Sequence, residues 1–64
     1  MQILLGLSRL GEIRHTELLS PLDPMRLISL ARLRAWHFPQ VEVWEEAVCI
    51  LRLPPAPSER GGAG

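Results

Sequence analysis

Few side chains in this sequence could carry chemistry, and the first pairing to consider is His37 with Cys49. A thiol activated by an imidazole is the arrangement used in nucleophilic catalysis. No third group that would orient the imidazole accompanies the pair, and no oxyanion-stabilising site is evident. We therefore interpret them as a helix-end imidazole and a small buried thiol, and expect that the chain is not an enzyme.

Three carboxylates, Glu42, Glu45 and Glu46, form the second candidate group. Acid–base catalysis needs two carboxyl groups in different environments, one of them shielded from water. At helical spacing these three residues share one polar face. The pattern favours a solvated surface over a catalytic pair.

A metal site would have to combine His15, His37, Cys49 and a glutamate. The close spacing typical of structural or catalytic metal ligands, such as C-x-x-C or two His on adjacent helical turns, is absent. We expect neither a metal nor another cofactor.

Length and composition limit what the chain can do alone. Its 64 residues allow one domain, which would bury only about 60% of the surface exposed by the unfolded chain. The single cysteine excludes an internal disulfide. Association is the remaining source of stability, so we expect another protein, or a second copy in a homo-oligomer, as the partner.

The charges give no reason to expect nucleic acid or anionic lipid as a partner, because the formal net charge is zero. All basic residues are Arg, and Lys, Asn and Tyr are absent, which is typical of a GC-rich reading frame. An unselected short reading frame, whose product has no defined fold, is therefore one alternative.

No apolar run is long enough for a membrane span, which needs about 18 residues. The N-terminal segment has no basic residue before its apolar run, unlike a secretory signal. Arg9 and Arg14 fit a mitochondrial presequence, whereas Glu12 and Glu17 do not. We expect an intracellular, cytoplasmic protein, with mitochondrial targeting left open.

Among the elements that must position these residues, the clearest is a helix over 24–37. Asp23 can cap it, and Pro24 suits the first helical position because it needs no N–H there. Its apolar residues recur at helical spacing and cover most of its circumference. Pro39 ends it, since the residue before a proline avoids helical geometry.

A second helix is predicted over 40–53. Val41, Trp44, Val48 and Leu51 form a stripe at helical spacing, and no turn signal divides the run. The competing interpretation is a strand, because Val41-Glu42-Val43 alternates and is rich in β-branched residues.

The remaining segments are less regular. Residues 2–14 show apolar spacing that predicts a third helix, although Gly6 and Gly11 oppose it; the alternative is a short strand at Ile3–Leu5. The Pro- and Gly-rich residues 54–64 predict a disordered tail, which leaves 1–53 as one domain.

These elements together predict an all-α fold, a helical hairpin of 24–37 and 40–53 with the first helix packed across it. The predicted function is a non-enzymatic protein-interaction or self-association module that uses an apolar, Trp-containing helix face. Its expected contact residues are Trp36, Leu27, Leu30, Arg32, Arg34, Val48 and Leu51.

The alternative function is a helix-turn-helix regulator that binds nucleic acid. Its second helix would place Glu42, Glu45 and Glu46 against the phosphates, which would repel them. Arg26, Arg32 and Arg34 point in different directions around the first helix and form no basic stripe. Both features disfavour this alternative.

Overall fold

The computed structural model describes residues 1–55 and contains four strands and one helix, so the all-α prediction is wrong. In chain order these are β1 (Gln2–Leu7), β2 (Ile13–Leu19), α1 (Pro24–Arg34), β3 (Gln40–Glu45) and β4 (Val48–Leu53). Most of the predicted disordered tail, from residue 56 on, lies outside the described residues.

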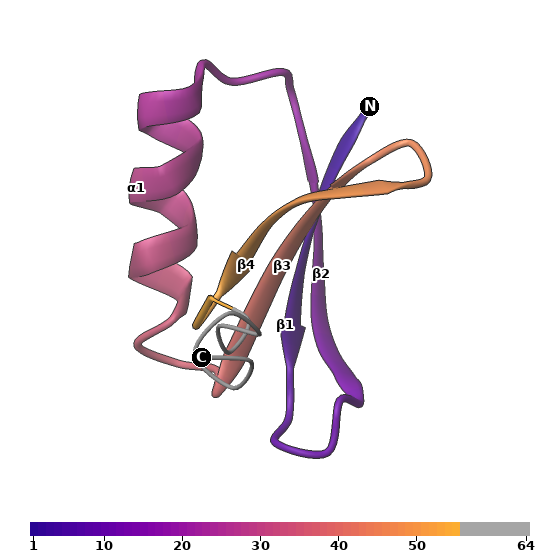
Figure 1. The fold of residues 1–64 in the computed structure, drawn as a ribbon, viewed down its shortest axis with the longest axis vertical. Helices are drawn as coiled ribbons and strands as arrows, with labels where there is room; N and C mark the ends of the chain where they lie inside the picture. The colour runs from indigo at the N-terminus through magenta and orange to yellow at the C-terminus, as the bar shows by residue number, and fades with distance from the viewer. Residues whose placement is uncertain (56–64) are drawn as a thin grey trace, which may run out of the picture.

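The four strands form one antiparallel sheet in the order β2-β1-β3-β4. The helix α1 lies along one side of this sheet, packed against β3 and β4, while β2 forms the edge away from it (Figure 1). One face of the sheet is therefore covered by α1 and the other is not.

The N-terminal segment is a strand and a loop, so the predicted helix over 2–14 is wrong and the alternative of a strand at Ile3–Leu5 is correct. Leu4 is fully buried beneath α1, and its neighbours Ile3 and Leu5 point to the other face. Because both faces of β1 carry apolar side chains, the run shows no alternation. This is why it resembled a helix in sequence.

The predicted helix over 40–53 is also wrong, because this segment is the β3–β4 hairpin. Val41 and Val43 are fully buried, in the alternation that the competing interpretation noted. The turn lies at Glu46-Ala47, where Glu46 adopts a φ of 54°. Turns of this kind usually carry Asn or Gly, so neither residue signals the turn in sequence.

The helix α1 begins as predicted. The carboxylate of Asp23 accepts a hydrogen bond from the Arg26 N–H at 3.0 Å, and Pro24 occupies the first turn. The helix ends at Arg34, earlier than the predicted bound of 37, with Ala35 as its C-cap. Of its residues only Leu27 and Ala31 are buried, so α1 contributes a narrow apolar stripe.

The core lies between α1 and the covered face of the sheet. Five buried residues form it: Leu4, Leu27, Ala31, Val41 and Val43. The side chain of Gln2, also buried, has partners at both of its polar atoms, since its amide donates to Glu45 and its oxygen accepts from the Leu22 N–H. This small core sits over β1, β3 and β4 and leaves β2 largely outside it.

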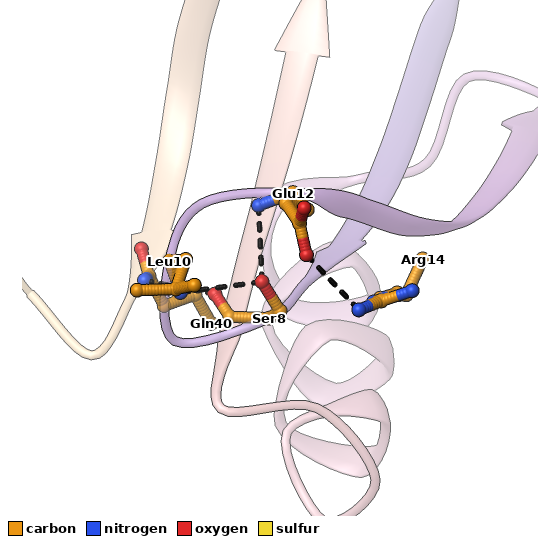
Figure 2. Close-up of polar contacts among 5 residues, drawn as sticks. All are labelled: Ser8, Leu10, Glu12, Arg14 and Gln40. Atoms are coloured by element: carbon orange, nitrogen blue, oxygen red, sulfur yellow. Dashed lines mark hydrogen bonds and ion pairs between the residues drawn. The ribbon is translucent and has the colours of Figure 1, made fainter.

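A loop held by Ser8 joins β1 to β2 (Figure 2). The Ser8 hydroxyl accepts hydrogen bonds from the backbone N–H groups of Leu10 and Glu12 at 3.2 and 3.1 Å. The side chain of Gln40, at the start of β3, donates to the Ser8 carbonyl at 3.1 Å. Gly11 supplies the left-handed backbone, with φ of 86°. The loop therefore fixes where β2 begins relative to β1 and β3.

Candidate functional site

The face of the sheet opposite α1 is the most distinctive surface of the molecule. The pairing register places side chains from all four strands on it. We call it the uncovered face and define it by Ile3, Leu5, Thr16, Leu18, Glu42, Trp44, Cys49 and Arg52. None of these residues belongs to the core cluster or packs against it.

Apolar side chains occupy most of the uncovered face. Ile3 lies directly between Leu18 on β2 and Trp44 on β3, because it pairs with both in the register. Leu18 is 68% exposed, whereas Ile3 and Trp44 are half-buried by their neighbours. Adjacent strands lie about 4.8 Å apart, so the three side chains form one continuous apolar row.

The two charged residues of the uncovered face form an ion pair with each other. Glu42 lies opposite Arg52, whose Nε is 3.3 Å from a Glu42 carboxylate oxygen. The other oxygen of Glu42 accepts a hydrogen bond from the Trp44 indole N–H at 2.9 Å. This face could therefore be covered by an apolar surface without leaving either charge unpaired.

A second cluster lies on the covered side, where the end of α1 meets β2. The guanidinium of Arg34 donates to both carboxylate oxygens of Glu17, one of them at 3.1 Å. The Nε2 atom of His15 lies 2.9 Å from the same carboxylate, and its N–H donates because an ionised carboxylate can only accept. Arg34 and then His15 lower the pKa of Glu17 from 4.5 to about 2.

Phe38 holds this cluster in place. Its ring stacks on the His15 imidazole, with centroids 5.2 Å apart, and meets His37 edge-on. Gly6 on β1 lies beneath the same ring, at a position where a Cβ would come within 2.6 Å of the Phe38 side chain. Only glycine at this position lets the ring lie against the sheet.

In this polar cluster the His15 imidazole is held in one orientation, but no nucleophilic side chain of the described residues lies beside it. The hollow beside it is lined by His15, Glu17, Arg34, His37 and Phe38, and no hydroxyl or thiol side chain of the described residues lines it. Glu17 stays ionised at neutral pH and is occupied by Arg34, so it cannot exchange protons there. The cluster links β2 to the end of α1.

The structure does not gather the predicted contact residues on one surface. Leu27 is buried in the core, and Leu30 and Leu51 are half-buried against it. Trp36 and Val48 are 85% and 62% exposed, Arg32 is exposed, and Arg34 is bound to Glu17. Their common helix face does not exist, because Val48 and Leu51 belong to a strand.

The candidate sites for chemistry are also separated. Cys49 lies on β4 and the uncovered face, where its thiol contacts the Leu51 carbonyl at 3.5 Å, whereas His37 follows α1. Glu42, Glu45 and Glu46 have different partners, namely Arg52, Gln2 and the N-terminal amine. Within residues 1–55, no group of three His, Cys, Asp or Glu side chains could hold a metal ion.

The helix-turn-helix arrangement is absent from the described part of the chain, which contains a single helix. Sequence reasoning also missed the residues that do share a surface, namely Ile3, Leu5, Thr16 and Leu18. The available signal was the apolar run of β1, which is too apolar for a strand with one solvated face.

No family model, curated protein or solved structure matches this chain. In the described residues, no helix has both the length and the apolar character needed to cross a membrane.

Proposed function

We propose that this chain is a small non-enzymatic self-association module, in which the uncovered face packs against the same face of a second copy. The observation that carries the proposal is the continuous apolar row of Ile3, Leu18 and Trp44, over which no described element lies. Exposed apolar surface of this kind on a small protein marks a site of interaction.

The size of the core supports association. Among the described residues, 1–55, only five form the buried core cluster. Chains of this size rarely gain more than about 3 to 5 kcal/mol from one core and usually add a disulfide, a metal or a partner. The single cysteine forms no internal disulfide, so a partner that covers the second face of the sheet would supply the missing burial.

A second copy fits this face better than a charged partner. The two charges on the face already bind each other, and the chain as a whole has no net charge. A surface that is apolar and internally neutral presents nothing that a copy of itself would repel. Two identical faces related by a two-fold axis form the commonest type of oligomer interface.

The dimensions of the sheet indicate a weak contact. Four strands about 4.8 Å apart and six residues long give a face of about 19 by 20 Å. A standard interface buries about 800 Å² on each partner, which is more than such a face can supply. The proposed contact therefore belongs to the class of weak, transient interfaces.

Sedimentation equilibrium over a range of concentrations tests the proposal, with Leu18→Glu as the disrupting variant. Leu18 is 68% exposed in the single chain, so covering the rest of its side chain in the contact would stabilise association by about 1 to 2 kcal/mol. We expect Leu18→Glu to raise the dissociation constant about tenfold or more. Leu18→Thr, which keeps a good strand-forming residue, should weaken association in the same direction.

The matched control is Leu33→Glu, the same substitution at an exposed position of α1. It should leave association unchanged. Equal effects of Leu18→Glu and Leu33→Glu, or a wild-type chain that stays monomeric at all concentrations, would refute the proposal. Circular dichroism on the same samples shows whether each variant keeps its fold.

Trp36 is the second candidate contact, since it is the most exposed aromatic residue and was expected at the interface. It lies just past the end of α1, away from the uncovered face. If Trp36→Ala abolishes association while Leu18→Glu does not, the contact lies at the end of the helix.

A further inference from the structure

We propose a second contact between copies of this chain: the β2 strands of two copies pair edge to edge, antiparallel, about a two-fold axis at Thr16. The pairing joins two four-stranded sheets into one of eight strands. It does not rest on the contact through the uncovered face, because it uses the hydrogen-bonding edge of β2.

The edge of β2 is open and regular. β2 is the outermost strand of the sheet, on the side away from α1 (Figure 1). From His15 to Leu19 it pairs with β1 without interruption, so its outer N–H and C=O groups form a regular row. Edges of this kind are templates for pairing with another strand.

The opposite edge of the sheet lacks this regularity. The register of β4 shifts at Ile50, which leaves only Leu51–Leu53 paired in an unbroken run beyond the shift. Pro54 and Pro55 follow directly and cannot donate backbone hydrogen bonds. Bulges and prolines are the devices by which proteins prevent edge pairing. β4 carries both, whereas β2 has no proline and its single register shift lies at Arg14, near the start of the strand.

The sequence of β2 is complementary to itself about its midpoint. Thr16 is the central residue of Ile13–Leu19, so an axis there sets the strand against its copy along its full length. The regular centre of that pairing is His15–Glu17, because β2 bulges at Arg14. In this register His15 lies opposite Glu17 of the second copy, and Glu17 lies opposite its His15. Directly opposed side chains have Cβ atoms about 5 Å apart, where a carboxylate stabilises a protonated imidazole opposite it.

Neighbouring registers lack this complementarity. An axis at Glu17 would set two carboxylates opposite each other, which is destabilising. An axis at His15 would oppose the two imidazoles and place Glu17 against Ile13. An axis at Leu18 would leave most of β2 without a partner. Among these registers, only the one centred on Thr16 spans Ile13–Leu19 and sets each carboxylate opposite an imidazole.

Contacts within one copy already hold the side chains that this pairing would use. Arg34 fixes the Glu17 carboxylate, and Phe38 fixes the His15 ring, so neither side chain must be ordered when the second copy binds. A carboxylate can accept about four hydrogen bonds, and Glu17 accepts three within its own chain. One acceptor site therefore remains, and the Nδ1–H of a neighbouring protonated imidazole fills it, because the Nε2–H of that imidazole already donates within its own chain.

Disulfide trapping in the full chain tests the register. Each variant carries Cys49→Ser, which removes the natural thiol, together with one new cysteine. In the proposed register the two Thr16 Cα atoms lie about 4.5 to 5.5 Å apart, within the range that a disulfide spans. Face-to-face packing alone would hold the two sheets about 10 Å apart, beyond that range.

The expected result is that Thr16→Cys forms a covalent dimer under mild oxidation at least tenfold faster than Leu18→Cys. Two copies of Leu18 would be about 14 Å apart along the strands, because each lies opposite Arg14 of the other copy. A mixture of Arg14→Cys and Leu18→Cys chains should therefore form the mixed dimer in preference to either homodimer.

If Thr16→Cys dimerises no faster than Leu18→Cys, or if the mixture shows no preference for the mixed dimer, the proposed pairing is overturned. The test separates the two contacts between copies. Rapid trapping at Thr16 in a chain whose sedimentation is unaffected by Leu18→Glu would leave the edge contact standing and remove the face contact. Slow trapping in a chain that Leu18→Glu dissociates would do the reverse.

Discussion

Replacing Gly6 by alanine probes the closest approach in the structure. A Cβ at this position would lie 2.6, 2.7 and 2.9 Å from three atoms of the Phe38 side chain. Carbon atoms in contact normally lie about 3.5 to 4.0 Å apart, so the ring must move by about 1 Å. That movement disturbs its stacking on His15, which lies 5.2 Å away between centroids.

The expected free-energy change has two parts. Overpacking of a tight site costs about 1 to 3 kcal/mol. Alanine in place of glycine lowers the conformational entropy of the unfolded chain, which raises stability by about 0.4 to 1 kcal/mol. Gly6→Ala should therefore lower the free energy of unfolding by about 1 to 2 kcal/mol, measured by urea denaturation followed by circular dichroism.

A double-mutant cycle identifies the cause. In a Phe38→Leu background the obstructing ring is gone, so Gly6→Ala should become neutral or slightly stabilising. Gly11→Ala is the matched control, because its φ of 86° disfavours alanine although no atom lies within 4 Å. Phe38→Leu should not rescue Gly11→Ala. If Gly6→Ala alone changes stability by less than about 0.5 kcal/mol, the packing of Phe38 on β1 is refuted.

Two further variants test the ends of α1. Glu17→Gln should lower the free energy of unfolding by about 1 to 2 kcal/mol at pH 7, because it weakens a partly exposed charged network. Since folding lowers the pKa of Glu17, the carboxylate contributes its full stabilisation above pH 4.5 and loses it as the pH falls toward 2. Urea titrations of wild type and variant should therefore converge at low pH. A difference that persists at low pH would contradict this assignment. Asp23→Ala should lower stability by about 1 kcal/mol in thermal or urea unfolding, because it removes the side chain that caps the Arg26 N–H. Asp23→Asn, which keeps a capping oxygen, should lower it little. Equal losses in the two variants would disprove the capping role.

The helix could be predicted because its signals are local. Asp23 and Pro24 mark its start within two adjacent residues, and the structure has the same cap. Its end was misplaced because Ala35, Trp36 and His37 are compatible with a helix, and only the proline at 39 marks a boundary. The helix in fact ends at Arg34, and the residues after it lead to Phe38, whose ring packs against Gly6 of β1.

The β3–β4 hairpin could not be recognised from its turn. Glu46 and Ala47 are good helix formers, and nothing in their identity predicts the positive φ that Glu46 adopts. Val41 and Trp44 happen to fall at helical spacing, although they lie on opposite faces of β3. The strand is favoured by pairing with β1, which is distant in sequence.

The uncovered face was missed for a related reason. Ile3, Leu18 and Trp44 lie far apart in sequence and become neighbours only through the order of the strands. Periodicity describes one element at a time, so it cannot show which residues different strands bring together. Arg34 was expected at a contact with a partner, and its partner within the chain, Glu17, was equally invisible.

The concentration dependence of Trp44 fluorescence tests the central claim, burial of the uncovered face in self-association, most directly. The chain has two tryptophans, so Trp36→Phe leaves Trp44 as the only reporter and Trp44→Phe leaves the exposed Trp36. We predict that the Trp44 emission shifts to the blue as the mass measured by sedimentation rises, while the Trp36 emission stays constant. A rise in mass without a shift at Trp44, or with a shift at Trp36 instead, would contradict the claim.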